Sequence, residues 1–252
     1  MKKILFTCLF ILTLAASPLL ADLTGKTIIN GVDANFPPFA FIDHDGQING
    51  FDIESINWIA QKFGFKVNHQ SLEWDSLIAN LMAKKIDIVS SGLSITAVRS
   101  TQISFTTPYW TVNQVVLVSK DSTLTAENVL TGGHKIGVQR GTSEANSMKK
   151  SNGVDGRDYT LEDYPSPELA ANDVVSGRIM AVVMNDAPAA EITKSLSLKI
   201  VGSAGIPAEQ FAFGIHKANP ELMLTLNQGL KQLMADPFWK TLKKKYKLGE
   251  LK

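Results

Sequence analysis

A ten-residue stretch, 90–99, combines residue types that can hold a small anion. It follows an apolar run at 86–89, which predicts a strand, and Ser94 or Thr96 has the chemistry of a helix start. Free N–H groups at a helix start favour a negative charge, and the planar guanidinium of Arg99 matches a carboxylate. The stretch therefore predicts an anion site at the carboxyl end of a strand.

The same stretch offers groups for a cation. Gly92 has no Cβ, so its carbonyl can approach a ligand ammonium closely, and the hydroxyls of Ser91, Ser94 and Thr96 donate or accept hydrogen bonds. Together these groups can hold an α-amino acid by its two charged ends. The alternative is an ordinary capped helix with a solvated arginine, and the ten residues alone leave both open.

Three further polar loops follow predicted strands, at 33–39, 140–143 and 185–186. Open α/β sheets bind ligands beyond the carboxyl ends of their strands, so these loops extend the predicted site. Because they belong to two different halves of the chain, we expect the site to lie between two lobes.

The elements that position these loops alternate between strand and helix, which predicts parallel sheets with helices on both faces. Asp52 is expected to cap a helix that Gly64 ends, and Met82 is expected to face inward from the next helix. The other expected strands lie near 27–32, 39–42, 65–70, 135–138, 158–161 and 180–184. The other helices are expected at 143–150, 167–175, 220–234 and 237–246, with one more that has Pro188 in its first turn.

The two halves resemble each other weakly. Residues 77–89 align with 169–182, and both segments end in a strand followed by small or polar residues. The β-type run at 111–119 is the expected crossing between halves, and 210–215 is the expected return. We therefore expect two similar lobes joined by two strands.

Composition and the amino terminus limit the class of protein. Residues 1–21 read as a cleavable signal peptide, with Lys2 and Lys3 before an apolar core, so we expect a periplasmic protein. The formal net charge of +1 argues against nucleic acid as a partner. The only cysteine, Cys8, lies in the signal segment, and the four histidines lack ligand spacing, so no metal is expected. No dinucleotide or phosphate-loop motif predicts a cofactor.

Several motifs in a fixed order then indicate a family. The motifs are Asp33 with Phe36-Pro37-Pro38-Phe39, Gly50-Phe51-Asp52-Ile53-Glu54, Trp74-Asp75-Ser76-Leu77-Ile78, residues 91–99, Phe105 with Pro108-Tyr109, residues 137–142 and Asp186. With these motifs, the chain resembles the polar amino-acid periplasmic binding proteins of ABC importers, known as solute-binding family 3, over nearly its whole mature length.

The resemblance implies a type II periplasmic-binding-protein fold, in which two α/β lobes on a two-strand hinge close over the ligand. Lobe 1 would comprise 22–112 and 210–252, and lobe 2 would comprise 113–209. The implied partners are an L-amino acid and the membrane permease of an ABC transporter, and we expect a monomer that is not an enzyme.

The resemblance also implies roles for residues. Arg99 would grip the α-carboxylate with help from Ser94 and from backbone donors at Thr142 and Ser143. The α-ammonium would lie against Asp186, the Gly92 carbonyl and the Ser94 hydroxyl. Phe36 and Trp74 would enclose the side chain, with Asp33 at its far end.

Alternatives remain open at this stage. Phe36 and Trp74 are also typical of core aromatics, Asp186 of a helix cap, and Asp33 of a strand end. Asp33 and Glu144 near the expected mouth favour a cationic side chain. The rival function is an exported cyclohexadienyl dehydratase-like enzyme with Glu73 or Glu144 as its acid, and a detached sensory domain is a second rival.

Overall fold

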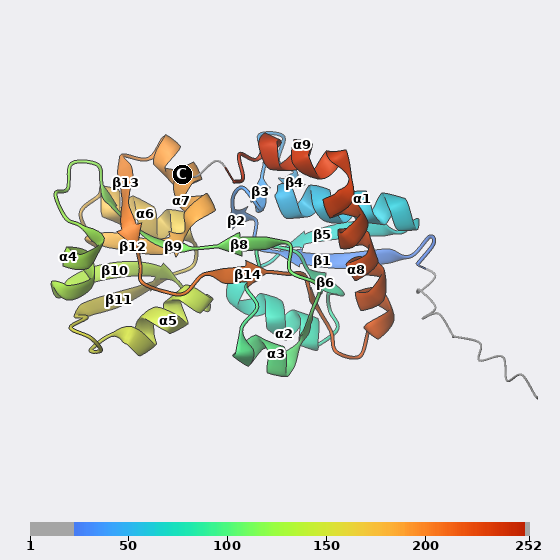
Figure 1. The fold of residues 1–252 in the computed structure, drawn as a ribbon, viewed down its shortest axis with the longest axis horizontal. Helices are drawn as coiled ribbons and strands as arrows, with labels where there is room; N and C mark the ends of the chain where they lie inside the picture. The colour runs from blue at the N-terminus through green and yellow to red at the C-terminus, as the bar shows by residue number, and fades with distance from the viewer. Residues whose placement is uncertain (1–22, 250–252) are drawn as a thin grey trace, which may run out of the picture.

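The computed structural model describes residues 23–249, so the expected signal peptide at 1–21 lies outside the described residues. Two lobes, each built on a five-stranded sheet, lie end to end (Figure 1). The lobe 1 sheet has the order β5 (Lys66–Ser71), β1 (Thr27–Val32), β6 (Ile88–Val89), β15 (Gly214–Ile215) and β7 (Ser104–Phe105). The lobe 2 sheet has the order β11 (Tyr159–Tyr164), β10 (His134–Gln139), β12 (Ala181–Asn185), β9 (Gln114–Ser119) and β13 (Leu198–Ser203).

Each sheet contains one strand that runs against its neighbours, so the expectation of purely parallel sheets is wrong. In lobe 1, β15 pairs antiparallel with β6 and β7, and in lobe 2, β9 pairs antiparallel with β12 and β13. Both strands follow directly after a crossing segment and therefore run away from the other lobe. The equivalent strand orders agree with the weak internal repeat.

Two antiparallel strands, β8 (Trp110–Val112) and β14 (Glu209–Phe211), cross between the lobes at the front of Figure 1. The expected crossing run at 111–119 is divided at Asn113: β8 crosses, whereas β9 belongs to the lobe 2 sheet. These two strands form the connection around which the lobes can move.

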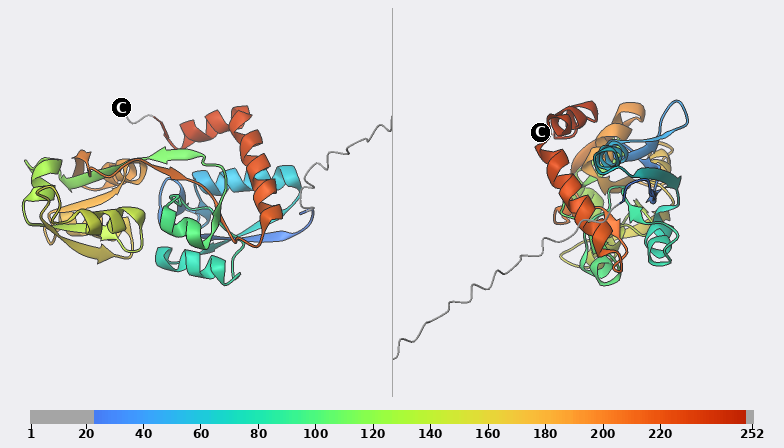
Figure 2. Two further views of the ribbon diagram at one scale, coloured as in Figure 1. Left: turned by 60° about the horizontal axis from the view of Figure 1, so that its bottom comes forward. Right: turned by 90° about the vertical axis from the view of Figure 1, so that its right-hand side faces the viewer.

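Helices cover both faces of each sheet (Figures 1 and 2). On lobe 1, the closing helices pack against the first long helix through a shared core that includes Ile59, Leu226 and Leu230. Among residues 23–249, none of the helices has the length and apolar character that a membrane span requires. Lobe 1 carries α1 (Phe51–Phe63), η1 (Trp74–Ser76), α2 (Leu77–Met82), α3 (Ala97–Gln102), α8 (Pro220–Ala235), α9 (Pro237–Lys245) and the small sheet of β2 (Asn35–Phe36), β3 (Ala40–Ile42) and β4 (Ile48–Asn49); lobe 2 carries α4 (Ala126–Thr131), α5 (Ser143–Ser151), α6 (Pro167–Val175) and α7 (Asp186–Ser195).

Two local expectations differ from the structure. Gly50, not Asp52, is the N-cap of α1, because the Asp52 side chain turns into the protein instead. Met82 is 47% exposed rather than inward, since α2 ends at that residue. By contrast, Gly64 ends α1 in the left-handed conformation, and Pro188 lies in the first turn of α7, as predicted.

Candidate functional site

The loops expected to bind a ligand meet where the two lobes touch. The amide Nε2 of Gln139, at the end of β10, donates to Asp33 Oδ2, just after β1, at 2.7 Å. Close by, Arg140 Nε donates to Asp75 Oδ2 at 2.7 Å, which makes an ion pair between lobes. The carboxyl ends of strands from both sheets therefore face one another across a closed seam.

Arg99 lies in this seam, in the first turn of α3, and only 7% of it is exposed. Thr96 caps the helix by accepting from Arg99 N, which fixes the start of the turn. The guanidinium donates to Ser94 O at 2.9 Å and, across the seam, to Gly141 O at 3.3 Å. Burial lowers the pKa of Arg99, and the charges of Glu144 and Glu209 oppose that shift.

The guanidinium has no carboxylate counter-ion within 4.0 Å among residues 23–249. Its two hydrogen bonds go to backbone carbonyls, so three of the roughly five donors of an arginine are without a protein acceptor in the same range. Its carbon Cζ lies 5.3 Å from the centre of the Trp74 ring. Arg99 is thus a buried cation with donors to spare.

The start of α5 faces Arg99 from the other lobe. Thr142 is the N-cap, and its hydroxyl is committed to Ala145 N and Gln139 O. The backbone N–H groups of Thr142 and Ser143 precede the first intrahelical bond and make no hydrogen bond to the described chain. These N–H groups and Arg99 are therefore the free donors of the seam.

The loop after β6 is held by its own polar groups. Gly92 has a φ of 61° and donates its N–H to Asp52 Oδ2 at 2.6 Å. The Ser91 hydroxyl bonds to the backbone of Asp33 at 3.0 and 3.3 Å, so it joins two strand ends rather than pointing to a ligand. Ser94 is 3% exposed and supplies a carbonyl to Arg99.

Phe36 and Trp74 come together, with ring centres 6.5 Å apart and planes tilted by 31°. A flat group between two rings needs about 3.5–4.0 Å on each side, so the pair must open by about 1 Å to admit one. A Cβ on Gly92 would lie 2.4 Å from the Phe36 ring, which shows how closely that loop packs beneath Phe36. The pair is both a lining of the seam and part of the lobe 1 core.

Asp33 is 1% exposed and accepts from Gln139 through Oδ2 and from Asn35 through Oδ1. Burial raises the pKa of this carboxyl, although the Gln139 and Asn35 hydrogen bonds lower it. Asp33 therefore already has partners in the closed seam and is not a free anion.

Asp186 is not brought into contact with Arg99. Its Oδ2 accepts from Asn113 N at 3.3 Å and Nδ2 at 3.0 Å, and its Oδ1 accepts from Ala187 N at 2.9 Å. The groove that Arg99 lines receives no side chain from Asp186. In this closed form Asp186 instead holds the junction of β8 and β9.

Other residues of the seam are not among the predicted ligand contacts. Glu144 is 3% exposed, and Glu209, the first residue of the crossing strand β14, accepts from the Ser143 hydroxyl at 2.6 Å. Glu209 lacks a sequence signal, because nothing in its neighbourhood places it opposite α5. Gln139 lies inside a recognised motif, and its amide function follows only from the contact with Asp33.

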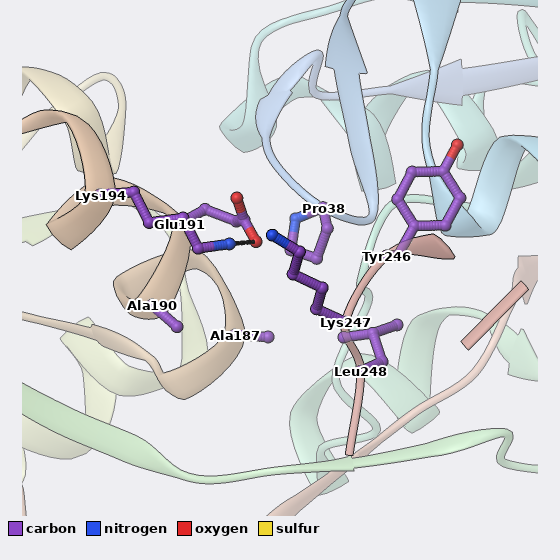
Figure 3. A pocket seen from close by; sticks show the side chains of 8 residues that line it. All are labelled: Pro38, Ala187, Ala190, Glu191, Lys194, Tyr246, Lys247 and Leu248. Atoms are coloured by element: carbon purple, nitrogen blue, oxygen red, sulfur yellow. Dashed lines mark hydrogen bonds and ion pairs between the residues drawn. The ribbon is translucent and has the colours of Figure 1, made fainter. Parts of the chain in front are cut away.

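Several hollows are lined by residues of both lobes. One, of about 450 Å³, lies between α3 and α5 and is lined by Ile95, Thr96, Val98, Arg99, Ser143, Asn146, Ser147, Lys150 and Glu209. Another, of about 180 Å³, lies between α7 and the chain after α9, where Lys194 pairs with Glu191 (Figure 3). No predicted ligand contact lines this second hollow, whereas the first contains Arg99 and Ser143.

Comparison with known proteins identifies the family to which this architecture belongs. Residues 28–250 match the family model of the bacterial extracellular solute-binding proteins, family 3. The chain belongs to this family. A family-3 protein with two lobes, a two-strand crossing and a buried arginine between the lobes agrees with the fold expected from the sequence.

Relatives of this family-3 protein are amino-acid-binding proteins. The L-cystine-binding protein TcyJ of Escherichia coli (strain K12) is 28% identical over 225 residues, which cover 87% of this chain and 82% of TcyJ. The putative ABC transporter arginine-binding protein 2 of the same strain is 30% identical over 251 residues, covering 98% of this chain and 99% of that protein.

Solved structures agree. An ancestral arginine-binding protein bound to arginine is 32% identical, with a TM-score of 0.81 and coverage of 89% of this chain and 99% of that chain. The ancestral amino acid-binding protein AncCDT-1, a precursor of cyclohexadienyl dehydratase, is 33% identical, with a TM-score of 0.79 and coverage of 87% and 95%. The fold is therefore that of two-lobed amino-acid-binding proteins.

Proposed function

We propose that this family-3 protein captures a polar L-amino acid between its lobes and passes it to the membrane permease of an ABC transporter. The observation that supports this most is the buried Arg99 guanidinium, which has no carboxylate partner within 4.0 Å among residues 23–249. A buried charge without a counter-ion is costly. A ligand carboxylate supplies the missing negative charge and accepts hydrogen bonds from the unused N–H groups of Arg99.

The ligand's two charged ends are assigned to opposite parts of the seam. The α-carboxylate accepts from Arg99 and from the N–H groups of Thr142 and Ser143. The α-ammonium donates to the Gly92 carbonyl, the Ser94 hydroxyl and Asp186, whose carboxylate uses three of about four lone-pair sites for Asn113 and Ala187. Each charge-assisted hydrogen bond contributes about 1.5–3 kcal/mol.

The side chain of the ligand is assigned to the space that Phe36 and Trp74 would enclose, with Asp33 beyond it. A cationic side chain fits best, because a cation lies favourably against an aromatic face and near carboxyl oxygens that accept hydrogen bonds. The arginine-binding relatives support this preference. Because another relative is an L-cystine-binding protein, other polar amino acids should be tested as well.

Closure would link capture to delivery. A ligand that contacts both lobes shifts the population towards the closed form, and a permease can recognise that form. The relatives act as binding proteins, and we place this one in the periplasm, where the predicted signal at 1–21 would direct it.

A thermal-shift panel of the twenty L-amino acids and L-cystine tests the proposal on the mature protein. A ligand at about 1,000 times its Kd should add roughly 4 kcal/mol to the free energy of unfolding. Arg99→Ala should abolish every shift, whereas Arg178→Ala, a 73% exposed arginine side chain of lobe 2, should leave the shifts unchanged. Binding that survives Arg99→Ala would refute the site.

The second candidate is a dehydratase-like enzyme. A buried carboxylic acid, Glu144, and the likeness to a precursor of cyclohexadienyl dehydratase favour it. Mixing the protein with prephenate and following ultraviolet absorbance tests this function directly. If the protein converts prephenate and Glu144→Gln abolishes that conversion, the function is enzymatic and the receptor proposal is wrong.

A further inference from the structure

Two carboxyl groups share one hydroxyl beside Arg99. Ser143 Oγ lies 2.6 Å from Glu209 Oε2 and 3.4 Å from Glu144 Oε2. Glu144 belongs to the first turn of α5 and is 3% exposed, whereas Glu209 comes from the crossing strand β14 and is half-buried. The cluster thus joins lobe 2 to the hinge at the place where the ligand carboxylate is assigned.

The cluster has one hydroxyl hydrogen for two carboxyl oxygens. A serine hydroxyl donates a single hydrogen, and the shorter contact places it on Glu209. The longer contact to Glu144 becomes a hydrogen bond only when Glu144 itself carries a proton and donates it to Ser143 Oγ. One added proton therefore completes a chain from Glu144 through Ser143 to Glu209.

The surroundings of Glu144 set the balance between its two forms. Burial raises the pKa of Glu144 to about 7, and the negative charge of Glu209 also raises this pKa. A hydrogen bond from its own backbone N–H, the charge of Arg99 and a hydrogen bond with Thr142 each lower the pKa. On the outer side of α5, the Lys149–Asp163 ion pair lies on the exposed surface, and Lys150 lines the groove farther along the helix. Tyr159, on β11 behind α5, bonds to Met148 O.

A ligand carboxylate changes this balance. It takes the spare donors of Arg99 and places a further negative charge beside Glu144 and Glu209. Like charges in a buried site disfavour ionisation, so the nearest neutralisable carboxyl gains a proton.

We propose that Glu144 takes up a proton when the ligand carboxylate binds to Arg99, so that the affinity for amino acids rises as the pH falls. This proposal rests on the function proposed above and adds to it a coupling between ligand binding and one proton. The proton moves from solvent to a Glu144 oxygen, and it then completes the hydrogen-bond chain from Glu144 through Ser143 to Glu209.

Isothermal titration calorimetry measures this proton directly. L-arginine and L-glutamine, or another amino acid that the panel selects and whose side chain does not titrate near neutrality, are titrated at about pH 7.5 in phosphate and in Tris. Because the two buffers differ in ionisation enthalpy, the difference in apparent binding heat counts protons. We expect uptake of up to about one proton per ligand and a Kd that rises by up to about tenfold per pH unit above neutrality.

Four variants separate Glu144 from the other carboxyl groups. Glu144→Gln should bind without proton uptake and with a Kd that no longer depends on pH, whereas exposed Glu127→Gln on α4 should behave like the wild type. Glu209→Gln removes a neighbouring charge and should reduce uptake without abolishing it. Asp33→Asn should leave uptake intact, although the pKa of Asp33 is also raised.

The outcomes are distinct. Binding without proton uptake in the wild type, proton release, or uptake that persists in Glu144→Gln would overturn this inference while the receptor function stands. Uptake that disappears in Asp33→Asn instead would assign the proton to the other end of the site and also overturn it. If no amino acid binds, both proposals fail together.

Discussion

Asp52 is a carboxyl group with no exposed surface, at 0% exposed. A buried carboxyl group with a shifted pKa makes the stability of a protein depend on pH. Asp52 Oδ2 accepts from Gly92 N and from the Tyr109 hydroxyl, each at 2.6 Å, while Oδ1 is buried without a partner among the described residues. Burial raises its pKa to about 7, although both hydrogen bonds lower it. Asp52 thus fixes the loop that bears the predicted ammonium contact.

We predict that the free energy of unfolding falls as the pH rises from about 4 to about 7. The pKa of Asp52 is about 7 in the folded chain against an ordinary 3.8, so its contribution is complete below pH 3.8 and is lost as the pH approaches 7. Asp52→Asn imitates the protonated acid and should flatten this dependence in urea unfolding series, whereas exposed Asp45→Asn should not. Parallel pH curves for wild type and Asp52→Asn would contradict the prediction.

Arg99 should not tolerate lysine, because a point charge cannot reach two carbonyls and a ligand carboxylate together. We predict that Arg99→Lys weakens ligand binding by about 1.5–3 kcal/mol, as measured by calorimetry. Arg157→Lys is the matched control: Arg157 also donates to two carbonyls, those of Ala204 and Gly205, within lobe 2. Equal losses of affinity in both variants would place the effect in general stability rather than at the site.

Among the elements, the start of α5 and the loop before it carry the closest approach between lobes. Gly141 has a φ of 78°, and a Cβ there would lie 3.2 Å from Asp75 Cβ in the other lobe. Its carbonyl also accepts from Arg99. The loop is therefore glycine-dependent both for its backbone conformation and for the fit across the seam.

Gly141→Ala should affect closure beyond its backbone strain. Gly177, with a φ of 75° and nothing within 4 Å of its added Cβ, supplies the control for strain alone. Both alanine variants should lose about 1–2 kcal/mol of stability, since each places a side chain in the left-handed region. Only Gly141→Ala should also raise the Kd for the ligand; an equal rise in Gly177→Ala would show that strain in lobe 2, not contact between lobes, is responsible.

For the whole molecule, three hydrogen bonds among residues 23–249 join the lobes near the strand ends: Gln139 with Asp33, Arg140 with Asp75, and Arg99 with Gly141. Arg140 and Asp75 are exposed, so salt screens their attraction, whereas the buried pair Gln139 and Asp33 is less sensitive. The closed form is therefore stabilised by one salt-dependent contact and by others that depend on burial.

Arg140→Ala should shift the molecule towards the open form. We predict a Kd about two- to fivefold higher at low salt and a difference that shrinks at about 0.5 M NaCl, because the lost ion pair is screened there. Lys135→Ala, which removes a comparable exposed ion pair with Glu162 inside lobe 2, is the control. An Arg140→Ala effect that persists at high salt, or that Lys135→Ala reproduces, would count against an ion pair between lobes.

The sequence by itself determined many of the helices and strands, and the order of the family motifs, but it did not predict α4 or β13. Helix α6 spans Pro167–Val175 as predicted, Gly64 ends α1, and Thr96 caps α3, because caps, prolines and glycines act on backbone groups within one turn. The sequence also predicted the family, since its motifs keep their order along the whole chain.

Only the tertiary structure decided which partners the buried polar groups have. Gln139 meets Asp33 across 106 positions of sequence and Ser143 meets Glu209 across 66, and neither pairing leaves a local pattern. Aspartate is a residue type typical of helix caps, yet the Asp52 side chain is buried and accepts hydrogen bonds from Gly92 and Tyr109. Local chemistry fixes how a backbone starts and stops, whereas the partner of a buried side chain depends on which distant segments folding brings beside it.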